Sequence, residues 1–304
     1  MQARIWSAIG GASLAWGSAG IATRAALNAG VPPIAMSAIR AVLAALVLFA
    51  ALQLLGVRIS RDPAVWRTGV VAAVFQLATP FVLFTLAYQY ASAGFVGLIV
   101  ALVPLGTATV AHFMLPDEPL HAPKAVGLVT AFAGVAILLL SGDSGLDEGG
   151  RPLLAAALSV GAVAAISFAS VYAKRKAGTY DPTEITWMQF AIGGVLIVIL
   201  GMFTEGVPAA ITGWGWTMMV YLAVIGSVVP FLLFYWLLRH VSTTKAALVG
   251  YIVPLVAITG GVVLLDEQIQ PGIVLGGILI FAGIVLTNRA EHRLPEAAPT
   301  VQLG

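Results

Sequence analysis

The amino-acid sequence predicts an all-α integral membrane protein with ten transmembrane helices, arranged as two inverted five-helix repeats. Three observations predict this fold. First, 60% of the 304 residues are hydrophobic and only 9% are charged, whereas a soluble domain carries about 25% charged residues. Second, long apolar runs follow one another with short connections. Third, the second half of the chain repeats the first. Most side chains are therefore expected to face lipid or other helices.

The transmembrane helices follow from the length of the apolar runs. A bilayer core of about 30 Å requires roughly 20 apolar residues in a helix. Arg4 before the first run is a feature of signal peptides, but removing that run would break the repeat, so we expect it in the mature protein. The short connections hold no Walker A loop, which excludes an ATP-driven pump for this chain alone. The predicted spans are 5–27, 34–56, 67–89, 94–114, 124–141, 152–172, 184–203, 215–238, 246–265 and 271–288.

The repeat appears when the sequence is compared with itself at an offset of about 150 residues. Pro80 then meets Pro230, Val103-Pro104-Leu105 meets Val253-Pro254-Leu255, and Asp117-Glu118 meets Asp266-Glu267 after a one-residue slip. Because each repeat holds an odd number of helices, the second must enter the membrane from the opposite side. The predicted repeats are residues 1–142 and 151–290, followed by a disordered cytoplasmic tail, 291–304.

The distribution of basic residues predicts the orientation. Cytoplasmic connections carry an excess of Lys and Arg. A cytoplasmic N-terminus leaves only Arg24 and Arg151 outside, so both termini are expected in the cytoplasm. The basic residues then placed inside are Arg4, Arg58, Arg61, Arg67, Lys124, Lys174, Arg175, Lys176, Arg239, Lys245, Arg289 and Arg293.

Four prolines lie near the middle of predicted spans: Pro80, Pro104, Pro230 and Pro254. A proline inside a helix removes a backbone donor and frees the carbonyl four residues earlier. These carbonyls belong to Gln76, Val100, Gly226 and Gly250. The prolines are either fixed kinks or hinges for alternating access around a site at the bilayer midplane.

Glycines with a repeated spacing, Gly127 with Gly134 and Gly276 with Gly283, predict close packing of the fifth and tenth spans. Such packing either lies within one chain or forms a homodimer. Monomer and homodimer both remain open.

Polar residues inside the spans are few. All acidic residues fall in connections or at helix ends, so an intramembrane carboxylate is not expected as a proton or sodium carrier. His112 in the fourth span is either a group suited to proton exchange or a hydrogen-bonded histidine at a helix end. Arg40 lies well inside the second span and either binds a substrate carboxylate, ties helix ends through carbonyls or reaches outward to the interface. Without cysteine, disulfides and thiolate sites are impossible. We expect no metal, no cofactor and no nucleic-acid partner.

Aromatic and amide side chains within the spans are candidates to face a substrate pathway. Each could instead contact lipid or pack between helices. Trp66, Trp214 and Trp216 are read as interfacial anchors. The candidates for substrate binding, besides Arg40, are Trp16, Gln76, Phe81, Phe84, Tyr88, Phe168, Gln189, Tyr235 and Tyr251.

Several of these features together resemble the ten-helix EamA family of the drug/metabolite transporter superfamily, over residues 5–288. They are Trp16-Gly17-Ser18, Ala38-Ile39-Arg40, the paired prolines Pro104 and Pro254, and the duplicated acidic pairs. The resemblance implies export of small metabolites, such as amino acids, across the inner (plasma) membrane, with the aromatic amino acid exporters as a nearest branch. Alternatives are a multidrug or other metabolite exporter, a membrane scaffold and, least favoured, a membrane enzyme. The first span lacks the buried glutamate of small multidrug exporters, and Arg40 alone is too little to neutralise a phosphate. A neutral or zwitterionic solute fits best.

Overall fold

The computed structural model describes residues 2–291 except 58, 116–121, 147, 177–180, 209 and 242–247. All regular structure in these residues is helical, which confirms the predicted class. The elements are α1 (Gln2–Asn28), α2 (Pro33–Leu55), α3 (Pro63–Val71), η1 (Ala72–Ala78), α4 (Thr79–Ala87), α5 (Ala93–Val100), α6 (Val103–Met114), α7 (Ala122–Leu140), α8 (Pro152–Arg175), α9 (Pro182–Thr204), α10 (Gly213–Ala223), η2 (Val224–Val228), α11 (Val229–His240), α13 (Leu248–Leu265) and α14 (Pro271–Glu291).

Six of the described helical stretches are long and apolar enough to cross a membrane, and three shorter helices are also apolar. Long, exposed apolar side chains cover the outer faces of these helices, as expected for lipid contact. The predicted count of ten crossings would be completed by α1 and stays a prediction. The expected tail overlaps the end of α14, and residues 292–304 lie outside the described part.

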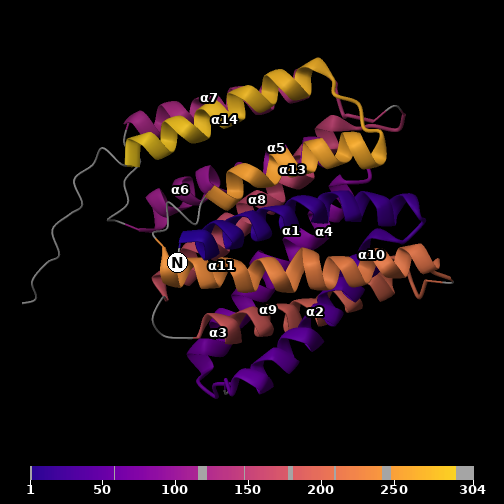
Figure 1. The fold of residues 1–304 in the computed structure, drawn as a ribbon, viewed down its shortest axis with the longest axis vertical. Coiled ribbons are helices and arrows are strands. Elements are labelled where there is room, and N and C mark those ends of the chain that lie inside the picture. Colours follow the sequence, from indigo (N-terminus) through magenta and orange to yellow (C-terminus); the bar gives the residue numbers. More distant parts are fainter. Residues whose placement is uncertain are drawn as a thin grey trace, which may run out of the picture.

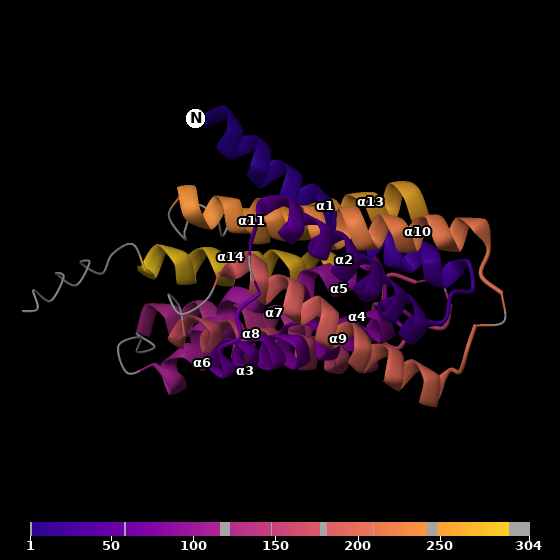
Figure 2. The same cartoon turned by 90° about the horizontal axis from the view of Figure 1, so that it is seen from below.

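The helices form an elongated bundle. Figure 1 shows α7 and α14 side by side at one end, and α2, α3 and α9 at the other. Seen from below in Figure 2, α1, α10, α11 and α13 form one layer, and α4, α6 and α8 lie in the opposite layer. The helices run back and forth so that the start of α1, marked N in Figure 1, and the end of α14 lie on the same side, here called the terminal side. The other side is called the opposite side.

Glycine explains the close pairing of α7 with α14. A Cβ on Gly134 would lie 2.6 Å from the carbonyl oxygen of Gly276, and one on Gly276 would lie 2.8 Å from that of Gly134. Gly127 faces Gly283 in the same manner, because a Cβ on Gly127 would lie 2.5 Å from the carbonyl oxygen of Gly283. The predicted glycine contacts therefore lie within one chain, so they no longer support a homodimer along these helices.

The mid-span prolines have three different outcomes. Pro80 and Pro230 each follow a π-helical turn, η1 and η2, in which the residue before the proline bonds five residues back: Thr79 N to Val74 O and Val229 N to Val224 O. The helix breaks just before Pro104, between α5 and α6. At Pro254 α13 continues without interruption, so the expected bend at this proline stays a prediction. A proline kink can be absorbed without interrupting the helix when neighbouring residues adjust.

Candidate functional site

Arg40 is the centre of the candidate site. It lies on α2, and its guanidinium points to the π-helical turn η2, where Nε donates to Ser227 Oγ and Nη2 donates to Gly226 O, both at 2.9 Å. The Gly226 carbonyl is the one that Pro230 deprives of a backbone donor. One expected role of Arg40 was to bind carbonyls at helix ends. Arg40 does bind a backbone carbonyl, but this carbonyl lies in the π-helical turn η2 in the middle of a span.

Glycine and serine are needed at this contact. A side chain at Gly226 would press on Ala19 of α1, since its Cβ would lie 3.1 Å from Ala19 Cβ. Ser227 is fully buried, and its hydroxyl donates to Leu222 O at 2.9 Å while it accepts from Arg40. The Gly226 carbonyl and the Ser227 hydroxyl therefore both have hydrogen-bond partners, as buried polar groups require.

Aromatic rings continue from Arg40 across the bundle. The guanidinium carbon lies 4.2 Å from the centre of the Phe81 ring, a cation–π distance. Edge-to-face contacts then join Phe81 to Phe190 at 5.9 Å, Phe190 to Phe231 at 5.6 Å, and Phe231 to Trp16 at 5.5 Å. We call Arg40, Phe81, Phe190, Phe231 and Trp16 the central cluster. It joins α2, α4, α9, α11 and α1.

The central cluster is partly accessible. Phe190 is fully buried, whereas Arg40, Phe81, Phe231 and Trp16 are half-buried. No salt bridge joins Arg40 to an acidic residue in the part of the chain that the structure describes. An interior cation without an acidic partner, beside half-buried aromatic rings, can attract an anionic or π-bearing group.

Other predicted residues lie around this cluster or away from it. Tyr88 ends α4, with its hydroxyl facing Gly20 of α1, and Phe84 packs with it in an apolar core. Phe168 packs instead against Phe75, whose side chain is 38% exposed, at a ring distance of 5.0 Å. Phe168 thus belongs to a second aromatic contact, between α8 and η1, and its role in substrate binding stays a prediction.

The amides Gln76 and Gln189 have different surroundings. Gln76 is half-buried in η1. Gln189 lies on α9, is 1% exposed, and its Nε2 has no hydrogen-bond partner in the described structure. Tyr235 and Tyr251 lie in α11 and α13, but their side chains are outside the described residues. His112 lies in the last turn of α6, as predicted.

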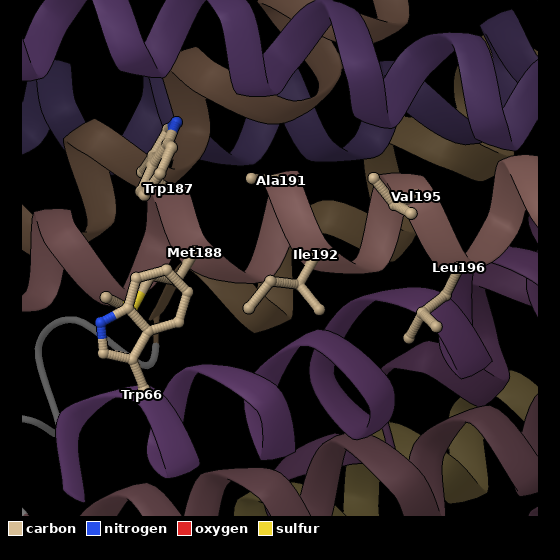
Figure 3. A pocket seen from close by; sticks show the side chains of 7 residues that line it. All are labelled: Trp66, Trp187, Met188, Ala191, Ile192, Val195 and Leu196. Carbon is tan, nitrogen blue, oxygen red and sulfur yellow. The ribbon is translucent and has the colours of Figure 1, made fainter. Parts of the chain in front are cut away.

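Two hollows lie away from the central cluster. A polar cavity of about 400 Å³ lies at the opposite side and includes Arg24, Asn28 and Gln89 among its lining residues. A groove of about 350 Å³ between α3 and α9 is almost wholly apolar (Figure 3). Trp66 is 39% exposed there, which fits its predicted interfacial place, and such a surface groove suits lipid chains rather than a polar solute. Its lining residues are Trp66, Trp187, Met188, Ala191, Ile192, Val195 and Leu196.

Sequence reasoning missed three glutamates that bind backbone N–H groups of the first half. Glu184 accepts from Ser60 N, Glu205 accepts from Ile34 N and Ala35 N at 3.0 and 2.8 Å, and Glu267 accepts from Ala93 N. Carboxylates at helix N-termini compensate the unpaired donors and the helix dipole. The duplicated acidic pair, which contains Glu267, was the available signal. Among the described residues, no three acidic or histidine side chains gather as a metal site would need.

Comparison with known proteins agrees with this architecture. The chain is 24% identical to the uncharacterized transporter YoaV of Bacillus subtilis strain 168, over 91% of this chain and 94% of that protein. It is 27% identical to protein PecM of Dickeya dadantii strain 3937 (90% and 88% covered). It is 25% identical to the uncharacterized inner membrane transporter YedA of Escherichia coli K12 (94% and 92% covered).

The fold is also found among solved structures. One crystal structure, 21% identical in sequence, matches with a TM-score of 0.66 over 95% of this chain and 98% of its own. A family model of EamA-like transporters matches residues 5–140 and, a second time, residues 153–289. These matches cover nearly the whole chain, so the protein is a multi-pass membrane transporter that belongs to the EamA-like transporter family.

Proposed function

We propose that this protein exports small neutral or zwitterionic metabolites, namely amino acids and among them aromatic ones, by alternating access. The observation that carries the proposal is the central cluster, where an interior guanidinium lies 4.2 Å from an aromatic ring. The basic residues of the terminal side support an orientation with both termini in the cytoplasm of the inner (plasma) membrane.

The chemistry of Arg40 favours a solute with one carboxylate. A guanidinium has five N–H donors, and the contacts with Ser227 and Gly226 use two of them. Further donors can therefore bind a carboxylate, while the half-buried rings of Phe81 and Trp16 can contact an apolar or aromatic side chain. A single interior cation is insufficient for a phosphate and repels a cationic drug.

The transport cycle would use two opposed repeats, residues 1–142 and 151–290. In this proposal the layer of α1, α10, α11 and α13 rocks against the layer of α4, α6 and α8. The prolines Pro80, Pro104, Pro230 and Pro254 are the hinges, since each weakens its own helix or the turn before it.

The decisive experiment measures efflux from proteoliposomes over a panel of amino acids, with and without a pH gradient. Arg40→Gln and Arg40→Lys are compared with Arg151→Gln, which removes an exposed arginine from a connection. We expect Arg40→Gln to reduce transport at least about tenfold, the equivalent of about 1.4 kcal/mol of lost binding, and Arg151→Gln to leave it unchanged. Normal transport by a folded Arg40→Gln protein would remove Arg40 from the substrate site.

The panel also separates the alternative functions. Transport of a planar cationic dye in preference to amino acids would favour a multidrug exporter. A solute that binds the folded protein raises its unfolding temperature by mass action, whereas a scaffold would show no such shift with any solute. We infer that the protein catalyses no reaction of its own.

The hinge role is tested separately. Pro104→Ala and Pro254→Ala, singly and together, should slow transport without lowering solute affinity. Unchanged rates in all three variants would refute hinges at these prolines.

A further inference from the structure

Glu267 is an acidic side chain that the fold brings into the protein from a connection. It follows α13, and the chain turns inward at Asp266, which has a positive φ of 53°. The backbone N–H of Glu267 donates to Gly261 O at 3.1 Å, and the carboxylate lies against Gly261, where a Cβ would overlap Oε2. Only 8% of Glu267 is exposed. Asp266 adopts the left-handed conformation that aspartate tolerates, and this turn directs the Glu267 carboxylate into the protein.

The carboxylate joins several elements at the opposite side. Both of its oxygens accept from Ala93 N, the first residue of α5, at 2.8 and 3.0 Å. Arg24 of α1 lies beside it, with Nε 3.8 Å from Oε1, and Arg24 Nη1 donates to Tyr88 O at the end of α4. Glu267 and Arg24 therefore connect the loop after α13 with α1, α4 and α5.

Two helices, α5 and α13, pack closely beside this connection. Two glycines of α5 pack closely on α13. A Cβ on Gly94 would lie 3.0 Å from the Ile258 side chain, and a Cβ on Gly97 would lie 3.0 Å from Ala257 Cβ. The other half of the same span, α6, packs on α8, where Gly106 faces Ser167. The two spans that contain Pro104 and Pro254 thus meet at the opposite side, next to Glu267.

The carboxylate is buried together with its partners. The N–H of Ala93 donates to both oxygens, and Arg24 lies beside the carboxylate while its Nη1 donates to a carbonyl. Burial raises the pKa of the Glu267 carboxyl, while the Ala93 N–H, Arg24 and the Gly94 N–H act in the opposite direction. The titratable groups around it are Arg24 on α1, Tyr88 at the end of α4 and Asp266 in its own loop.

We propose that Glu267 is a proton-binding site of the opposite-side gate, and that the closed gate binds this proton more tightly than the open gate. Separation of α5 from α13 would admit water to the buried carboxylate, and water stabilises its ionised form. Protons then favour the state that binds them better, which is the closed one. In the orientation of the proposed function, on which this inference rests, acid outside the cell closes the gate.

The absence of cysteine from the chain allows a direct test by thiol labelling. Ala257 is 2% exposed and lies between α13 and α5, so a cysteine there reacts only when these helices separate. Ala257→Cys protein in nanodiscs is labelled with a maleimide between pH 4.5 and 8. Its rate is divided by that of Glu148→Cys, an exposed position in the connection between α7 and α8, which corrects for ionisation of the thiol itself.

We expect the ratio to rise with pH, by up to about tenfold for each pKa unit that separates the closed and open gates. Glu267→Gln, which cannot ionise, should keep the slow rate at every pH, and Asp266→Asn should retain the pH dependence. Arg24→Gln should move the transition to higher pH, because it removes the cation that favours the ionised form. A ratio independent of pH in the parent, or an unchanged pH dependence in Glu267→Gln, would overturn the proposal.

If Glu267→Gln does not fold, Arg24→Gln still tests the proposal. A labelling ratio whose pH transition is the same in Arg24→Gln as in the parent would contradict the role of Glu267. No solute is needed for the labelling. A protein that transports none of the panel but shows the expected pH dependence would therefore refute the substrate proposal alone.

Discussion

Replacement of Gly134 by alanine tests the packing of α7 on α14. The added Cβ would lie 2.6 Å from Gly276 O and 2.9 Å from Ile280 N, whereas ordinary contact begins near 3.4 Å. Since both are backbone atoms, the helices must move apart by about 0.8 Å, the difference between these distances. Overpacking of this kind costs about 1–3 kcal/mol, and alanine returns up to about 1 kcal/mol of helix propensity.

Subtracting this gain from the cost leaves a net loss of up to about 2 kcal/mol, or a fall in the unfolding temperature of up to about 8 °C. Gly10→Ala is the matched control, because a Cβ there meets nothing within 4 Å. Its unfolding temperature should stay constant or rise slightly. Thermal unfolding of both variants is followed in detergent at two protein concentrations. Equal effects of the two substitutions, or a loss for Gly134→Ala that appears only where the protein is dimeric, would refute packing within one chain.

Three further predictions follow from the polar contacts. Glu205→Gln should destabilise the protein by about 1 kcal/mol, measured as a lower unfolding temperature, because it weakens two bonds to the start of α2. Ser227→Ala should reduce solute affinity more than Ser159→Ala, which alters a serine that bonds only its own helix, because only Ser227 orients Arg40. Because the pKa of Glu267 is raised by burial, its contribution to stability is complete below the ordinary glutamate pKa and is lost as pH rises through the raised value. The unfolding temperature of the parent should therefore fall over that window relative to Glu267→Gln, and parallel curves would contradict it.

Sequence predicted the helices well because the bilayer fixes their length. The predicted 34–56 and 271–288 differ from α2 and α14 by three residues or fewer at each end. Pro80 and Pro230 were also identified, because a missing N–H has a local consequence. At Pro254 the backbone carries no interruption of this kind, since α13 continues through it.

Contacts between distant residues were less predictable. Arg40 was identified by its charge, but its partner Ser227 lies 187 residues away. Glu267 was assigned to a connection, which is correct for its backbone, yet its side chain enters the fold because Asp266 turns the chain. Burial of a side chain depends on the turn before it and on the neighbours it meets, and neither is expressed in the hydropathy of the sequence.

Gln189 shows how the two halves differ at equivalent positions. It aligns with Arg40 in the repeat, yet it carries no charge, is 1% exposed and leaves Nε2 without a partner in the described structure. A buried unsatisfied amide costs about 1–3 kcal/mol, so Gln189→Leu should stabilise the protein or leave its unfolding temperature unchanged. Natural proteins retain such costs mainly at functional sites. If Gln189 contacts the solute, the same variant should lose transport while it gains stability, and Met188→Leu on the same helix should not. A Gln189→Leu protein that is less stable than the parent would show that the amide has a partner, such as water, and would end the argument that it is kept for function.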